Sequence, residues 1–81
     1  WKNSMRETIL AIIKQNSNYP ALGDFVVKES EIMYTYGSDN EIGRMIEEIE
    51  QEFDVVLTIS KDIGEMTVSE FINEVQQVVT S

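Results

Sequence analysis

One segment, residues 38–54, constrains the fold of this chain more than any other. It reads SDNEIGRMIEEIEQEFD, and its apolar residues follow one another at intervals of one, three or four positions. Such spacing is typical of an α-helix that buries a single apolar stripe. Ser38 and Glu41 supply the S-x-x-E pattern of a capped helix start. We therefore predict an acidic amphipathic helix whose stripe consists of Ile42, Met45, Ile46, Ile49 and Phe53.

An earlier segment shows the same helical period. We expect this first helix to run from Asn3 or Ser4 to Gln15, with Ser4 and Glu7 as its capping box. Pro20 disfavours helix at the residue before it and so limits how far the helix can extend. The predicted apolar stripe consists of Trp1, Met5, Ile9, Ile12 and Ile13.

The last helix is expected to begin at Thr67, which forms a T-x-x-E capping box with Glu70. Before it, residues 55–59 are apolar and β-branched, and we expect extended chain that crosses the core, because an isolated strand cannot satisfy its edges. A short helical turn near residues 60–63, ended by Gly64, is expected next. The apolar stripe predicted for the last helix consists of Val68, Phe71, Ile72, Val75, Val78 and Val79.

Residues 16–37 form a long connection between the first two long helices. Residues 26–27 and 33–36 have strand-like composition, but without partner strands we favour a packed irregular loop that holds a short helix or turn. The apolar residues expected to pack on the bundle from this loop are Leu22, Phe25, Val26 and Val27. The predicted fold is all-α: a small antiparallel four-helix bundle of three longer helices and one short one, with a long loop between helices one and two. It forms one domain over residues 1–81.

Composition narrows the functions open to this chain. A net charge of −9 disfavours nucleic acid and anionic membrane surfaces, because both are polyanions. It favours partners with basic patches, although an acidic surface also serves solubility alone. The longest apolar runs fall well below the roughly 18 residues that span a bilayer, and no signal peptide is visible. We therefore expect a cytoplasmic monomer that does not bind membranes.

Catalysis is not expected either. The chain has no cysteine and no histidine, so zinc sites of the usual kind and Ser-His or Cys-His catalysis are excluded. No EF-hand pattern is present, and we predict no metal site and no catalytic residue. Glu47 and Glu48 are adjacent on a helix and point in different directions, which is poor geometry for joint acid–base work.

Two strings in the second half of the chain are similar to a known family. Residues 46–54 read IEEIEQEFD and residues 67–72 read TVSEFI, and they resemble the end of helix two and the start of the last helix of acyl carrier proteins. The spacing from Phe53 to Val68 fits that family without a gap. The resemblance covers most of the chain and implies an acyl-carrier-protein-like bundle, although amphipathic helices also produce such strings by convergence.

The resemblance also implies a function. In the family, a serine at the start of helix two receives a 4′-phosphopantetheine arm from coenzyme A, transferred by a phosphopantetheinyl transferase with magnesium. The arm holds acyl intermediates of fatty acid or polyketide biosynthesis as thioesters, and acyl-chain-processing enzymes bind the acidic helix through basic patches. The partner contacts implied here are Glu41, Arg44, Glu47 and Glu48. A carrier-derived interaction module that is never modified is the alternative.

The attachment position does not align cleanly with the family signature Gly-x-Asp-Ser-Leu. Alignment from Gly37 places Asn40 at the serine, whereas alignment from Phe53 places Asp39 there. Ser38 is the one hydroxyl at the helix start. Either Ser38 is modified from a shifted position, or it is a plain N-cap and the attachment serine has been replaced, naturally or by design. Asn and Asp are also good N-caps, so the fold survives that loss while the carrier chemistry does not.

Overall fold

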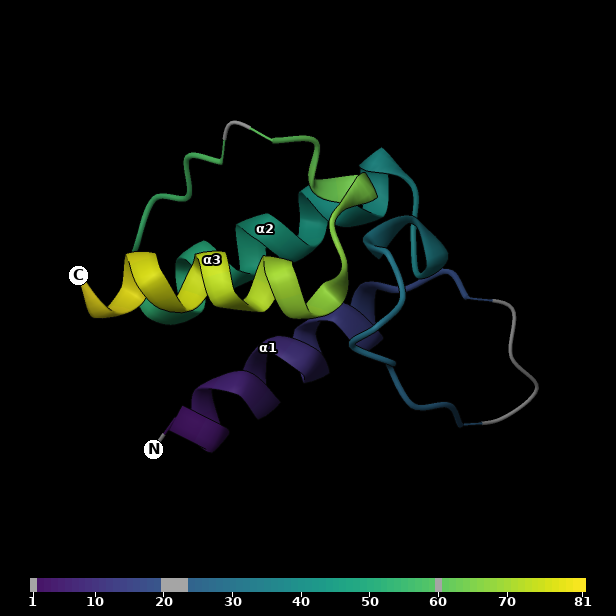
Figure 1. Ribbon diagram of the computed structural model, residues 1–81, viewed down its shortest axis with the longest axis horizontal. Helices are drawn as coiled ribbons and strands as arrows, with labels where there is room; N and C mark the ends of the chain where they lie inside the picture. The colour runs from purple at the N-terminus through teal and green to yellow at the C-terminus, as the bar shows by residue number, and fades with distance from the viewer. Residues whose placement is uncertain (1, 20–23, 60) are drawn as a thin grey trace.

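The computed structural model describes residues 2–19, 24–59 and 61–81. Three α-helices are present, α1 (Lys2–Asn16), α2 (Asp39–Phe53) and α3 (Val68–Thr80), together with two single 3-10 turns, η1 (Met33–Thr35) and η2 (Ile63–Glu65) (Figure 1). The described ranges contain no strand, only an isolated antiparallel bridge between Ile32 and Thr67. The prediction of a small, mostly helical domain with three longer helices is confirmed, whereas the short fourth helix is only a 3-10 turn.

The direction of the helices differs from the expected antiparallel bundle. α1 opposes α2, but α3 runs in roughly the same direction as α2 (Figure 1). The reason is the long connection after α2, which runs back along the bundle, so that α3 starts at the end of the molecule where α2 starts (Figure 1). At that end the connection is hydrogen-bonded to the loop around η1. The Met33 N–H donates to the Met66 carbonyl at 2.9 Å, and the Val68 N–H donates to the Glu31 carbonyl at 2.9 Å.

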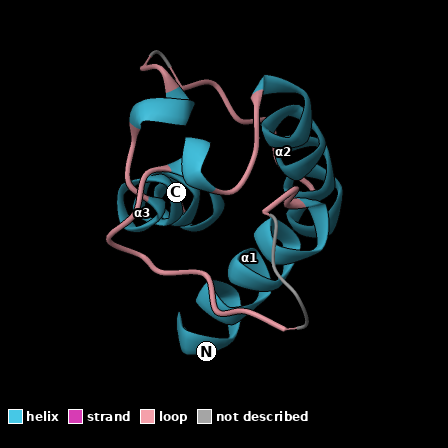
Figure 2. Cartoon of the chain, turned by 90° about the vertical axis from the view of Figure 1, so that its right-hand side faces the viewer, coloured by secondary structure: helices cyan, strands magenta, loops and turns pink. Residues whose placement is uncertain are grey.

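Both 3-10 turns lie at the end of the molecule where α2 and α3 begin, the end that faces the viewer in Figure 2. The long loop before η1 is irregular, as expected. Val27 is buried and Phe25 packs partly against the core, but Val26 is 80% exposed, so the expected packing is wrong for Val26.

Tyr36 organises the loop through hydrogen bonds. The Tyr36 carbonyl accepts from the Ser17 hydroxyl at 2.7 Å and from the Asn18 N–H at 3.0 Å, and its phenol oxygen accepts from the Lys28 N–H at 2.7 Å. Pro20 and Leu22, to which we assigned roles in this region, lie outside the described residues.

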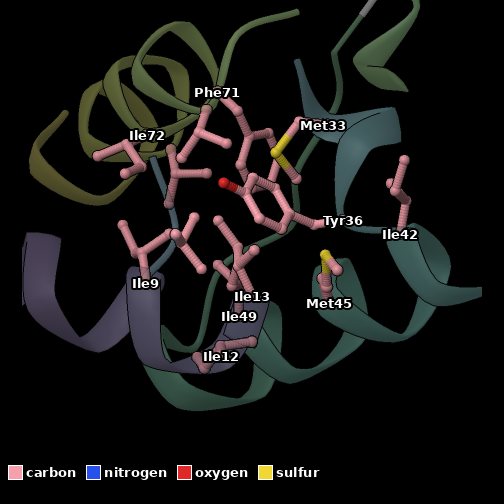
Figure 3. Close-up of a cluster of buried hydrophobic side chains, with 13 residues drawn as sticks. Ile9, Ile12, Ile13, Met33, Tyr36, Ile42, Met45, Ile49, Phe71 and Ile72 are labelled. Carbon is pink, nitrogen blue, oxygen red and sulfur yellow. The ribbon is translucent and has the colours of Figure 1, made fainter. Parts of the chain in front are cut away.

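The core lies between the three helices and the loop residues that cover them (Figure 3). The stripe of α2 is confirmed for Ile42, Met45 and Ile49, whereas Ile46 and Phe53 are only partly buried against the core. The buried apolar side chains are Ile9, Ile12, Ile13, Val27, Met33, Tyr36, Ile42, Met45, Ile49, Met66, Val68, Phe71, Ile72 and Val75.

The start of α1 differs from the prediction. The helix begins at Lys2 and ends at Asn16, so Ser4 lies inside its first turn and does not cap it. The Ser4 carbonyl instead accepts a hydrogen bond from the Thr8 hydroxyl at 2.8 Å. The S-x-x-E pattern is a local signal, and it does not decide the start of a helix that continues beyond it. Trp1, the expected extension of the stripe, lies outside the described residues.

The connection between α2 and α3 was also predicted incorrectly in part. Residues 55–59 do not cross the core: Val56 is 78% exposed, and only Leu57 and Ile59 pack against the edge of the core. The short turn lies at Ile63–Glu65, later than expected, so Gly64 lies inside it and does not end it. The turn is fixed by the Asp62 carboxylate, which accepts from the Gly64 N–H at 3.1 Å. Ser60, included in the predicted turn, is outside the described residues.

The two other capping predictions are confirmed. Ser38 and Thr67 are the N-caps of α2 and α3, and each forms a capping box with the glutamate three residues later. Within the described parts of the chain, no helix is both long and apolar enough to cross a bilayer.

Candidate functional site

The candidate site is the first turn of α2. Ser38 precedes the helix in extended conformation, with φ −82° and ψ −175°, and its side chain is exposed. Asp39 and Asn40 are exposed in the first turn, whereas Glu41 is partly buried. The three residues singled out at the attachment position, Ser38, Asp39 and Asn40, therefore all lie exposed at one helix end, next to the predicted partner contact Glu41.

Glu41 is the most heavily hydrogen-bonded residue of this turn. Its Oε1 accepts from the Ser38 N–H at 2.7 Å, from the Ser38 hydroxyl, and from Asn18 Nδ2 at 3.1 Å. Its Oε2 accepts from Arg44 Nη2 at 3.2 Å. The side chain is only 14% exposed. Sequence reasoning expected Glu41 to meet a partner's cations, but the structure shows that its carboxylate is already engaged by donors of the same chain.

These contacts also set the charge of Glu41. The Ser38 hydroxyl, followed by the Ser38 N–H, holds the pKa of the Glu41 carboxyl below its usual value, and the Arg44 guanidinium adds a smaller effect in the same direction. Hydrogen bonds to a carboxylate favour its charged form. Glu41 is therefore an anion at neutral pH, at the N-terminus of a helix that favours negative charge.

Gly37 allows Glu41 to reach this position. A Cβ atom at Gly37 would lie 2.5 Å from the Glu41 Cβ, which is far too close for two carbon atoms. Gly37 is buried, so the loop before α2 packs directly on the stem of the glutamate. The glycine that anchors the family-like signature thus has a local packing role here.

Tyr34 also contacts the first turn of α2, through a hydrogen bond to Asp39. Its hydroxyl lies 2.9 Å from Asp39 Oδ1, to which it donates, and 3.5 Å from Asp62 Oδ1. The hydrogen bond to Asp39 is the main reason that the pKa of Tyr34 rises to about 12, since the neutral phenol is the donor. Sequence reasoning assigned no role to Tyr34, because the contact joins residues on different elements and has no local pattern.

The acidic face of α2 continues beyond this turn. Glu47 and Glu48 are exposed, and Glu48 accepts from Asn16 Nδ2 of α1 at 2.9 Å. Arg44 is 58% exposed at its side chain and pairs with Glu41. Glu50 is less available to a partner, because its carboxylate already accepts a hydrogen bond from the Leu57 N–H at 2.8 Å. Of the predicted partner contacts, Glu47 and Glu48 are thus the acids that remain most available to a basic surface.

A phosphopantetheine arm requires a hydroxyl, and in the first turn only Ser38 offers one. Its exposed side chain at a helix N-terminus suits a phosphate, because the N-terminal N–H groups and the helix dipole favour anions. The carboxylates of Asp39 and Glu41 at the same helix end act against that preference. Asp39 and Asn40 cannot form the phosphodiester. Over the described ranges, no cluster of three or more Asp or Glu residues is arranged to hold a metal ion.

Comparisons with protein-family models, with curated proteins and with solved structures found no match to this chain.

Proposed function

We propose that this protein is an acyl carrier-like protein that carries acyl intermediates on a phosphopantetheine arm attached to Ser38. The observation that supports the proposal is the exposed Ser38 hydroxyl at the N-cap of α2, next to a helix whose sequence resembles that of carriers. When attached, the arm supplies a thiol that holds acyl groups as thioesters. Ser38 supplies the oxygen that anchors the arm, and α2 supplies its orientation at the end of the bundle.

The proposed partners are acyl-chain-processing enzymes with basic patches and a phosphopantetheinyl transferase. Glu47 and Glu48 are exposed on α2 and would meet Lys or Arg side chains of these enzymes. Contacts of this kind increase the association rate and weaken as salt is added, because exposed charges are screened. Glu41 has a different task in this proposal, since its carboxylate holds the cap.

Intact-mass measurement tests the proposal. The protein is incubated with coenzyme A, Mg²⁺ and a broad-specificity phosphopantetheinyl transferase. We expect a mass gain equal to one phosphopantetheine, and we expect Ser38→Ala to abolish it. Labelling that persists in Ser38→Ala would place the arm elsewhere, and a folded wild-type chain that gains no mass would contradict the carrier proposal.

A second function is favoured by one observation. The Ser38 N–H donates to Glu41 Oε1 at 2.7 Å, as in a purely structural capping box, while the two positions aligned with the family's serine hold Asp39 and Asn40. The protein would then be an unmodified module that only docks to a partner through α2. For this function we expect no mass gain in the wild-type chain but a gain in Asn40→Ser or Asp39→Ser, because the transferase would still recognise the fold.

A further inference from the structure

The Ser38 hydroxyl is not free in the folded chain. It donates to Glu41 Oε1, and the same oxygen accepts from the Ser38 N–H at 2.7 Å. The glutamate therefore binds both polar hydrogens of the residue that is proposed to be modified. It also places a carboxylate at the N-terminus of α2, the place where an attached phosphate would gain most from the helix N–H groups.

We infer that Glu41 restrains the proposed modification of Ser38, so that transfer of phosphopantetheine to this hydroxyl is slower than the exposure of the side chain suggests. This inference rests on the proposed carrier function and names a regulation of the same site. The restraint has two parts: a hydrogen bond that the hydroxyl must give up, and a negative charge next to the position that the phosphate must occupy.

The chemistry of the transfer explains the second part. The Ser38 oxygen attacks the phosphorus that carries the pantetheine group in coenzyme A, a new O–P bond forms, and the bond to the bridging pyrophosphate oxygen breaks. The 3′,5′-ADP leaves with the electrons of that bond, and the hydroxyl proton passes to solvent. The donor is anionic, and the phosphodiester that forms on Ser38 is anionic too. Both are repelled by a carboxylate within hydrogen-bonding distance of the reacting oxygen.

Glu41 cannot easily turn away to relieve that repulsion. Asn18 donates to the same carboxylate oxygen from the loop after α1, and Arg44 donates to the other one. Gly37 packs against the glutamate stem, and the side chain is only 14% exposed. The carboxylate is thus held from several sides, which distinguishes Glu41 from Glu47, an exposed acid of the same helix.

The test compares initial rates of labelling by intact mass, with coenzyme A, Mg²⁺ and the same transferase, for the wild-type chain, Glu41→Gln and Glu52→Gln; Glu52 is exposed on α2 and is not among the proposed partner contacts. Gln at position 41 keeps an oxygen that accepts from Ser38 but removes the charge. The matched control removes one charge from an exposed position of the same helix. We expect Glu41→Gln to be labelled about three- to tenfold faster than wild type, as for the loss of a partly screened charged hydrogen bond. Glu52→Gln should not be labelled faster.

Each outcome decides the question. Equal or slower labelling of Glu41→Gln, with the wild-type chain labelled at Ser38, would overturn the restraint and leave the carrier function standing. Equal acceleration by Glu52→Gln would also overturn it, since the effect would then be one of net charge. Absence of labelling in every folded variant would overturn the carrier function and the restraint together. Labelling of Glu41→Gln alone would support the restraint, whereas the unlabelled wild-type chain would contradict the carrier function. If Glu41→Gln fails to fold by circular dichroism, Glu41→Asp replaces it. Aspartate keeps the charge and withdraws the carboxylate from Ser38, and a rate above wild type is again required.

Discussion

The ring of Tyr34 lies directly against the backbone of Gly64. A Cβ atom at Gly64 would lie 2.1 Å from the ring carbon Cζ of Tyr34, so no larger residue fits while the tyrosine is in place. This contact joins η1 to η2 and positions the Tyr34 hydroxyl between Asp39 and Asp62. It therefore connects the candidate site at the start of α2 to the connection that leads into α3.

Gly64→Ala should destabilise the protein by displacing the Tyr34 ring. Forcing an extra methyl group into a packed contact typically costs about 1–3 kcal/mol of unfolding free energy. Urea denaturation followed by circular dichroism measures the loss. In a Tyr34→Ala background the same substitution should have little effect, because the space is then open. A similar loss in both backgrounds would show that Tyr34 is not the cause.

Asp54→Gly should stabilise the protein. Asp54 ends α2 in the left-handed conformation, with φ 54° and ψ 51°, and it places a negative charge at a helix C-terminus, where the dipole disfavours it. Glycine adopts this conformation without a Cβ penalty, so we expect a gain of about 0.5–1 kcal/mol in unfolding free energy. Asp54→Ala is the control: it removes the charge and keeps the Cβ, so a gain as large as that of glycine would contradict the conformational explanation.

The Tyr34 phenol should titrate at unusually high pH. Its pKa is raised from 10.0 to about 12, chiefly by the hydrogen bond to Asp39. Because the folded-state pKa lies above the unfolded-state value, the contribution of this group to stability is complete below pH 10 and is lost as the pH rises through 12. Ultraviolet absorbance of the phenolate follows the titration. Asp39→Asn should lower the pKa of Tyr34, and an unchanged alkaline titration in that variant would contradict the assignment.

Acid should weaken the caps of α2 and α3. Glu41 and Glu70 both have a pKa below their usual 4.5, the first because of Ser38 and the second because of the Thr67 N–H and hydroxyl. Their folded-state pKa values lie below the unfolded-state ones, so their contribution is present above about pH 4.5 and is lost as the pH falls through the lowered values. Thermal melts from pH 7 to pH 2 measure this loss. Glu70→Gln should melt with a smaller dependence on acid than wild type, and an unchanged dependence in that variant would contradict this explanation.

The helical nature of α2 and α3, the limits of α2 and the start of α3 were contained in the sequence. The helical period of their apolar residues and the S-x-x-E and T-x-x-E patterns involve residues at most a few positions apart, so local sequence is enough to predict them. The same reasoning failed at Ser4, because α1 continues to Lys2 and an equally good local pattern lies inside the helix.

The tertiary structure decided where these helices lie and what their side chains are free to do. α3 runs in roughly the same direction as α2 (Figure 1) because backbone hydrogen bonds hold the start of α3 to the loop around Ile32. Nothing in the local sequence distinguishes Glu41 from the exposed acids of α2. In the folded chain, however, its carboxylate also accepts a hydrogen bond from Asn18, which lies 23 residues earlier. Tyr34 and Gly64 likewise meet only in the folded chain. The helical period of apolar residues and the capping of a helix are set by residues that are neighbours along the chain. The direction of a helix, the exposure of a side chain and the hydrogen-bond partners of a charged group depend on contacts between distant segments, and no local pattern encodes them.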